Sequence, residues 1–159
     1  MPRRPSALQA ELRQRRPFAS LGAEATVSIL RTASALRRSL ARVVEAEGLS
    51  LAQYNVLRIL RGAGDAGLPT LAIRDRLIEE APGITRLIDK LEAAGLVRRE
   101  RSTPDRRQVL CHITARGRAF LRRLDAAVDA ADAAAVAALT KQEQRELIRL
   151  LEHIRASPR

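Results

Sequence analysis

Residues 83–114, GITRLIDKLEAAGLVRRERSTPDRRQVLCHIT, decide how this chain folds, because the spacing of their apolar residues changes part-way along. In the first third the apolar residues recur every three or four positions, which is the period of an amphipathic α-helix. They predict a helix from about residue 83 to residue 94, with one apolar face: Ile84, Leu87, Ile88, Leu91 and Ala94. The opposite face carries hydrogen-bonding side chains: Thr85, Arg86, Asp89 and Lys90. Gly95 is a typical helix stop.

The rest of the stretch has the pattern of a β-hairpin. The chain is expected to be extended through Leu96 to Arg101, and Pro104 stands in a turn where a φ of about −65° is favoured. From residue 108 to residue 113 the apolar period becomes two, which predicts a strand. Its two sides would carry Val109, Cys111 and Ile113 on one face and Gln108, Leu110 and His112 on the other. The predicted two-stranded hairpin has a charged tip: Asp105, Arg106 and Arg107.

Helical patterns lie on both sides of this stretch. A short one from about residue 70 to residue 79, followed by the breaker at 80–83, completes a helix-turn-helix. Before it, Ser50 can cap a helix that ends before the glycines at 62, 64 and 67, and residues 25–47 form a long amphipathic pattern. After the hairpin, Thr114 can cap a long helix, and Thr140 begins a second one with a capping box.

The charge of the chain is strongly positive and uneven. Lysine and arginine number 29 against 18 aspartates and glutamates, a formal net charge of +11 at pH 7. Most arginines of the region 98–123 are opposed only by Glu100 and Asp105, whereas acids slightly outnumber bases after Leu124. Positive charge gathered in one region favours a polyanionic partner such as nucleic acid.

Several classes of protein fit poorly. The single Cys111 excludes an intrachain disulfide, and with two histidines it gives no spaced zinc site, so no metal or cofactor is expected. No signal peptide or membrane-spanning stretch is evident, which favours a cytoplasmic, nucleoid-associated protein with no membrane partner. No nucleophile stands with a base and no phosphate loop is present, so an enzyme is not expected. Aromatic residues are too few for a single-strand or RNA-binding platform.

We therefore interpret the stretch as a winged helix-turn-helix that binds double-stranded DNA. The helix would enter the major groove, and the arginine-tipped wing would reach the adjacent minor groove. Asp89 would either accept from a base or pair with Arg86. The candidate residues on the helix are Gly83, Thr85, Arg86, Asp89 and Lys90, those of the wing are Asp105, Arg106 and Arg107, and weaker phosphate contacts are Ser50, Thr70, Arg99 and Arg101. A sequence-indifferent architectural DNA-binding protein would use the same basic wing and is the alternative.

The expected fold is mainly α-helical, with the winged domain between two sets of dimerisation helices. The terminal helices have more apolar face than a small winged domain needs, which suits a subunit interface. The predicted divisions are a mobile basic arm (1–20), an N-terminal dimerisation helix (21–48), the DNA-binding domain (49–114) and C-terminal dimerisation helices (115–159). Tyr54 and Cys111 are expected to be core residues, and His112 and His153 to be surface or partly buried.

The order and spacing of these motifs resemble the MarR family of winged-helix transcriptional regulators. The likeness rests on residues 84–92 (ITRLIDKLE), on 95–99 (GLVRR), and on Asp105-Arg106-Arg107 leading to Ile113-Thr114 and Gly117. The resemblance implies a repressor that binds a pseudo-palindromic operator as an obligate homodimer, and it implies release by a small-molecule effector. It also implies that Asp105 orients the wing while Arg107 enters the minor groove.

Overall fold

The computed structural model describes residues 6–79, 83–101 and 109–156. They fall into two compact units, residues 1–39 and 40–159. The first holds α1 (Ala7–Glu11) and most of α2 (Leu21–Glu45). The second holds the end of α2 and all later elements: α3 (Leu51–Ala63), the 3-10 turn η1 (Gly64–Ala66), β1 (Leu68–Pro69), α4 (Thr70–Arg74), α5 (Ile84–Ala93), β2 (Val97–Arg101), β3 (Val109–Ile113), α6 (Ala115–Ala135) and α7 (Lys141–Ala156).

In the first unit, part of the segment expected to be a mobile arm is helical. Ser6 caps α1 by accepting a hydrogen bond from the backbone N–H of Gln9, 3.3 Å away. Glu11, the last residue of α1, pairs with Arg31 of α2, with 2.7 Å between Oε1 and Nε. The single acid of this basic segment therefore ties α1 to α2.

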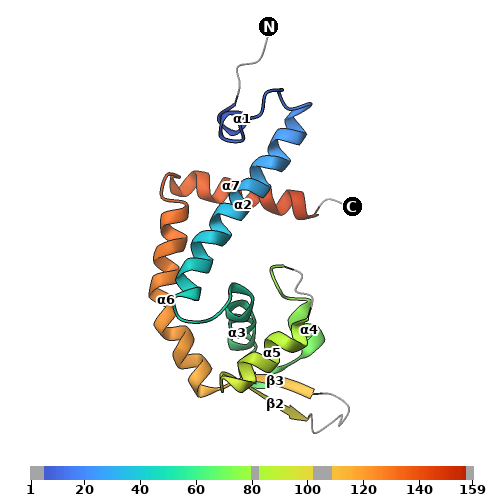
Figure 1. Ribbon diagram of the computed structural model, residues 1–159, viewed down its shortest axis with the longest axis vertical. Coiled ribbons are helices and arrows are strands. Elements are labelled where there is room, and N and C mark those ends of the chain that lie inside the picture. Colours follow the sequence, from blue (N-terminus) through green and yellow to red (C-terminus); the bar gives the residue numbers. More distant parts are fainter. Residues whose placement is uncertain (1–5, 80–82, 102–108, 157–159) are drawn as a thin grey trace. The chain divides into compact units, whose positions relative to one another are not determined.

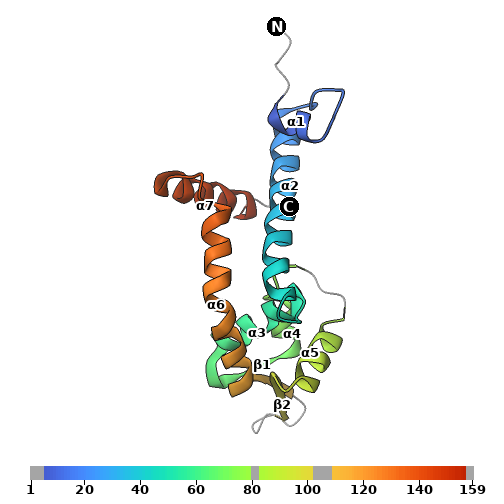
Figure 2. The ribbon, with the colours of Figure 1, turned by 60° about the vertical axis from the view of Figure 1, so that its left-hand side comes forward.

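In the second unit, α3, α4 and α5 gather beside the sheet, and α6 leads away from them to α7 (Figures 1 and 2). The helices start where the sequence predicts. Ser50 and Gln53 form a reciprocal capping box before α3, and Thr140 and Glu143 exchange the same bonds before α7. Thr114 Oγ1 accepts from Gly117 N at 3.0 Å and so begins α6.

The sheet differs from the predicted hairpin, because it has three antiparallel strands in the order β1-β3-β2. In the β2–β3 pair, Val97 faces Ile113 and Arg99 faces Cys111. Leu68 of β1 faces Cys111 from the other side. A two-residue strand is too short to show any periodicity, so β1 left no signal in the sequence.

The core of the second unit lies between α3, α5, α6 and β3. Its fully buried side chains come from each of these elements, from the end of α2 and from α4: Val44, Val56, Leu57, Leu60, Ile73, Ile88, Leu91, Cys111 and Leu121. Tyr54 and Cys111 are core residues, as predicted. α4 is shorter than the predicted helix of 70–79, since the assigned helix ends at Arg74.

His112 corrects the sequence prediction, because it is buried with 8% of its surface exposed. Its imidazole lies against Gly67, whose φ is +66°, and any Cβ at that position would overlap the ring. The space that glycine leaves open is thus filled by the histidine. Its Nδ1 is buried without a hydrogen-bond partner among the residues that the structure describes.

Some large apolar side chains remain exposed on the terminal helices. They are Leu21, Ile29, Leu30 and Leu36 on α2, and Leu147, Ile148, Leu150 and Ile154 on α7. No helix within 6–79, 83–101 or 109–156 is long and apolar enough to cross a lipid bilayer.

Candidate nucleic-acid interface

Helix α5 separates its packing face from its polar face as the sequence predicts. Ile84, Ile88 and Leu91 are buried against the core. The polar face is open to solvent along the whole helix, with exposed side chains at Thr85, Arg86, Asp89, Lys90 and Ala93. An α-helix has the width to enter the major groove, and the exposed face of α5 is open to such a contact.

Glycines set both ends of α5. Gly83 stands at the N-cap with φ +90°, a left-handed conformation that few other residues adopt. After the C-cap Ala94, Gly95 has φ +70°, its N–H donates to Glu92 O at 2.8 Å, and Leu96 N donates to Leu91 O at 2.9 Å. These bonds close the helix and turn the chain directly into β2.

The turn between α5 and β2 is tied to the start of α6. Thr114 Oγ1 donates to the carbonyl of Gly95 at 2.8 Å, and Thr114 N donates to the carbonyl of Leu96 at 3.0 Å. A Cβ at Gly117 would overlap the Leu96 carbonyl oxygen, so α6 approaches this turn as closely as a glycine permits. The end of α5 therefore has little freedom to move against α6.

Arg99 of β2 joins the wing strand to α5. Its Nη2 donates to Asp89 Oδ1 at 2.6 Å, and its Nη1 donates to Glu92 Oε2 at 2.7 Å. The backbone N–H of Arg99 donates to Glu92 Oε1 at 3.0 Å, and Nη2 also lies 3.4 Å from the carbonyl oxygen of Thr85. We call this set, Arg99 with Asp89, Glu92 and Thr85, the Arg99 clamp.

The clamp changes two expectations about these residues. Asp89 pairs with Arg99 of β2 rather than with Arg86 of its own helix. Arg99, expected as a phosphate contact, has its guanidinium engaged by two carboxylates and is only 24% exposed at its side chain. Burial lowers the pKa of Arg99, but hydrogen bonds and charges from Asp89 and Glu92 outweigh this and leave the pKa raised.

The wing is described at its base. Arg101, at the end of β2, is exposed and faces Val109 of β3. Arg98 pairs with Glu100 on the same strand, and this hydrogen bond and the charge of Arg98 lower the pKa of Glu100. The predicted tip residues Asp105, Arg106 and Arg107 lie outside the described residues.

Two expected phosphate contacts have structural tasks. The Ser50 hydroxyl accepts from Gln53 N at 3.3 Å, as the cap of α3. Thr70 begins α4, is partly buried, and its hydroxyl lies 3.9 Å from the sulfur of Cys111. Burial raises the pKa of the Cys111 thiol, against the smaller lowering effects of Thr70 and Arg99, so the thiol is poorly ionised at neutral pH.

The role of Glu92 could not be predicted from the sequence: its carboxylate accepts hydrogen bonds from both the backbone N–H and the side chain of Arg99. Glu92 stands in the last turn of α5, seven residues before its partner, and nothing in the local pattern marks the pair. The only available signal was that its position borders the polar face of the helix.

The comparisons with known proteins agree with this geometry. The sequence pattern of the MarR family matches residues 49–109, from the start of α3 to the start of β3. An HTH-type transcriptional repressor of Mycobacterium tuberculosis is 34% identical over 126 residues, which cover 79% of this chain and 89% of the repressor. The chain belongs to the MarR family.

Solved structures of MarR proteins share the fold of this family member. A MarR transcription factor from Planctomyces limnophilus has a TM-score of 0.65 at 38% identity, over 85% of this chain and 98% of that one. A MarR-family protein of Mycobacterium tuberculosis in complex with salicylic acid has a TM-score of 0.64 at 33% identity, over 86% of this chain and 96% of that one. The predicted winged helix-turn-helix and the family resemblance are both confirmed. Relatives named as transcriptional repressors and regulators favour regulation over the architectural alternative.

Proposed function

We propose that this MarR-family chain is a transcriptional repressor that binds, as a homodimer, a double-stranded operator with inverted half-sites. It would act in the cytoplasm, on the nucleoid. The observation that carries the proposal is the polar face of α5, which is exposed along its length while the opposite face is fixed in the core. In this position Arg86 and Lys90 are free to reach base edges and phosphates.

The Arg99 clamp supports a reading role for α5. Since Arg99 bonds to Asp89 and Glu92, the base of the wing and the recognition helix are held at one angle. Because this angle is fixed in the free protein, less conformational entropy is lost when the helix and the wing bind two grooves at once. Asp89 thus affects DNA binding indirectly, because it holds Arg99 and so the position of α5. The residues of α5 that would contact bases directly are Thr85, Arg86 and Lys90.

The wing tip would supply the minor-groove contact. Arg107 is proposed to enter the groove, Asp105 to orient the tip, and Arg106 to bind the flanking phosphates. Arg101, which is exposed at the end of β2, would add a phosphate contact at the base of the wing. Narrow, A·T-rich minor grooves attract such arginines through their negative potential.

A second copy of the chain would cover the exposed apolar side chains of the terminal helices. Those of α2 include Leu21 and Leu30, which are 66% and 65% exposed, and those of α7 include Ile148 and Ile154, at 56% and 57%. Exposed apolar side chains that gather on one element are typical of protein–protein contact sites, and each of these two helices carries several. A homodimer also matches the two-fold symmetry of an inverted repeat, with half-sites about one helical turn apart.

The protein is further proposed to release DNA when a small molecule binds. Support comes from the relative that was crystallised with salicylic acid, which is 33% identical to this chain. A ligand that binds more tightly to a conformation with weak DNA affinity shifts the protein towards that conformation. The apparent affinity for the operator then falls by the ratio that this difference in ligand binding allows.

The test measures how two arginine variants bind to DNA. The DNA is the set of sequences that the purified wild-type protein selects from a random pool. Arg86→Ala should relax base preference at defined major-groove positions. Arg107→Ala should weaken binding by about 1 to 3 kcal/mol, most strongly where the flanks are A·T-rich. The matched control is Arg122→Ala. Arg122 is an exposed arginine on α6, so this variant also loses one positive charge.

The proposal predicts different outcomes for the three variants. If all of them weaken binding equally on every sequence, the arginines form only a basic surface and the proposal is wrong. Asp105→Ala separates an orienting role from a simple charge effect. Loss of a negative charge alone would strengthen DNA binding, whereas loss of the orienting contact should weaken it. Tighter binding at matched salt would contradict the orienting role of Asp105.

A further inference from the structure

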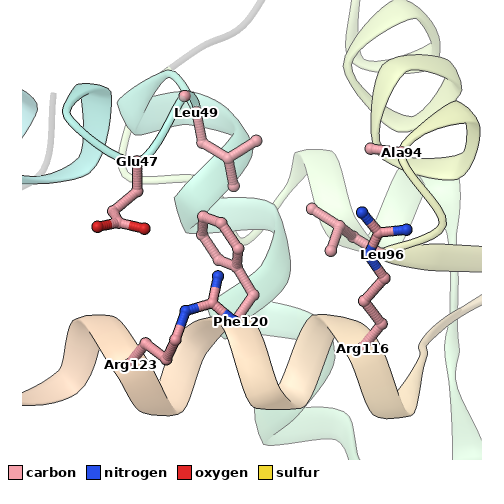
Figure 3. Close-up of a pocket in the computed structure, with 8 residues that line it drawn as sticks. Glu47, Leu49, Ala94, Leu96, Arg116, Phe120 and Arg123 are labelled. Carbon is pink, nitrogen blue, oxygen red and sulfur yellow. The ribbon is translucent and has the colours of Figure 1, made fainter.

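The first turn of helix α6 is bound to the turn that follows α5. The hydroxyl of Thr114 donates to the carbonyl of Gly95 at 2.8 Å, and its backbone N–H donates to the carbonyl of Leu96 at 3.0 Å. The same hydroxyl accepts from Gly117 N at 3.0 Å. Arg116, one residue into this turn of α6, points towards Leu96 (Figure 3). The side chain of Thr114 therefore belongs both to the cap of α6 and to the end of α5.

Two ion pairs hold α6 further along its length. Arg118 Nη2 lies 2.8 Å from Asp65 Oδ1 in η1, and Arg61 Nη1 of α3 lies 2.9 Å from each carboxylate oxygen of Asp125. The side chain of Asp65 is 98% exposed, whereas those of Arg61 and Asp125 are 35% and 38% exposed. Solvent and salt screen a shielded pair less than an exposed one. The Arg61–Asp125 pair is therefore the stronger of the two contacts.

The two halves of α6 have different surroundings. From Thr114 to Val128, a rise of about 21 Å, the helix is fixed by these contacts and by the burial of Leu121, Leu124 and Val128. From residue 129 to residue 135 none of its side chains is buried. The helix then leads to α7, which carries exposed apolar side chains (Figures 1 and 2). Helix α6 thus connects α5 to the surface that a second copy of the chain would cover.

We propose that Thr114 and the Arg61–Asp125 pair are positioning residues that set the half-site spacing which the dimer accepts. The inference rests on the proposed function, because it needs a homodimer that places two copies of α5 on one duplex. A change of one base pair in spacing moves a half-site by about 3.4 Å along the DNA and by about 35° around its axis. Helix α5 can follow this movement only if it moves against α6, which these contacts resist.

Substitutions at two positions separate the contact with α5 from the cap of α6. In Thr114→Asp the carboxylate can still accept from Gly117 N, but it cannot donate to the Gly95 carbonyl. Thr114→Ser keeps both hydrogen bonds and is the conservative control. Asp125→Ala removes the ion pair with Arg61. The double variant Thr114→Asp/Asp125→Ala gains one carboxylate and loses one, so its net charge equals that of the wild type.

The first experiment measures affinity for duplexes of equal length in which the half-sites of the selected operator are moved together or apart by one base pair. The wild type should lose about tenfold in affinity or more on each shifted duplex, the usual cost of misplaced base contacts. The double variant should lose about threefold or less. Because all duplexes carry the same number of phosphates, the ratio between spacings does not depend on the charge of the protein.

Two controls separate positioning from damage to the surface that contacts DNA. The double variant should bind a duplex with a single half-site as tightly as the wild type does, because α5 and the wing keep their own contacts. Arg122→Ala removes an exposed arginine of α6 that has no ion pair within the described residues, so it should discriminate between spacings as sharply as the wild type. Thr114→Ser should do the same.

The second experiment needs no DNA. Nitroxide labels are placed at two exposed positions, Ala93→Cys on α5 and Ala130→Cys on α6, in a Cys111→Ser background. Excess unlabelled protein is added, so that each dimer contains one labelled chain. Pulsed electron paramagnetic resonance should give a single narrow distance distribution when Thr114 and Asp125 are present, and a broader one in the double variant.

Several results would overturn the proposal. A wild type that accepts all spacings equally, or a double variant that is as selective as the wild type, contradicts it. If Thr114→Ser relaxes spacing as much as Thr114→Asp does, the hydrogen bond to Gly95 is not the determinant. A single half-site affinity that falls as far as operator affinity would mean that these residues only maintain the fold. If no inverted repeat is selected, the proposed function is wrong, and the width of the distance distribution still shows whether these residues hold α5 against α6.

Discussion

Replacing Arg99 tests whether it holds the recognition helix or contacts DNA phosphates. In Arg99→Ala the protein loses two ion pairs, to Asp89 and Glu92, whose carboxylate side chains are 54% and 40% exposed. At this exposure each pair contributes only about 0.5 kcal/mol. The Arg99 stem adds about 1 kcal/mol, because two methylene groups are lost from a side chain that is largely buried. The expected destabilisation is therefore about 2 kcal/mol.

The assay combines thermal unfolding with DNA binding over a series of salt concentrations. A loss of about 2 kcal/mol should lower the Tm by about 4 to 8 °C for a chain of this size. Operator affinity should fall while its salt dependence stays unchanged, since no phosphate contact is removed. In a double-mutant cycle of Asp89→Asn and Arg99→Gln, the coupling should be about 0.5 kcal/mol.

Arg101→Ala is the matched control, since Arg101 ends the same strand and is exposed. As a phosphate contact it should lower the slope of log affinity against log salt by about 0.9, with little change in the Tm. If Arg99→Ala behaves in this way instead, with an unchanged Tm and a smaller slope, the clamp does not hold α5 and the reasoning is refuted.

Three further variants or measurements check the supporting structure. Gly117→Ala should destabilise the protein by about 1 to 3 kcal/mol, because its Cβ overlaps the Leu96 carbonyl, and unfolding by urea measures this. The Cys111 thiol is buried and has a raised pKa, so it should react with a thiol reagent only after unfolding. Peroxide should therefore release DNA equally from wild type and from Cys111→Ser. Rapid labelling of the native protein would contradict this. Ser50→Ala removes the cap of α3 and should cost about 1 kcal/mol of stability; a change in salt slope without that loss would mean that Ser50 contacts phosphate.

The parts of the fold that depend on neighbouring residues could be predicted from the sequence. The caps at Ser50, Thr114 and Thr140 lie three residues from the groups they bond, so they are visible in a short window. The two faces of α5 follow from a period that continues over several turns, and Gly95 marks the end of that helix. These local signals were sufficient for the winged helix-turn-helix.

The features that depend on distant residues could not be predicted. Arg99 finds Asp89 ten residues earlier in the chain only because the turn at Gly95 brings β2 back beside α5. His112 is buried because Gly67, 45 residues away, leaves room for its ring, and the alternation of β3 gave no sign of this. The pocket lined by the α2–α3 loop, the turn after α5 and the start of α6 likewise combines three segments that are distant in the sequence (Figure 3).

The central claim, sequence-specific recognition by a homodimer, is tested most directly by one comparison of affinities. The purified protein selects DNA from a random pool, and its affinity for the selected duplex is then compared with that for a scrambled duplex at the same salt concentration. A specific regulator should prefer the selected duplex by about 10³ to 10⁷. The preferred site should be an inverted repeat with half-sites about one helical turn apart. A ratio near one, or a selected site without two-fold symmetry, would contradict the account.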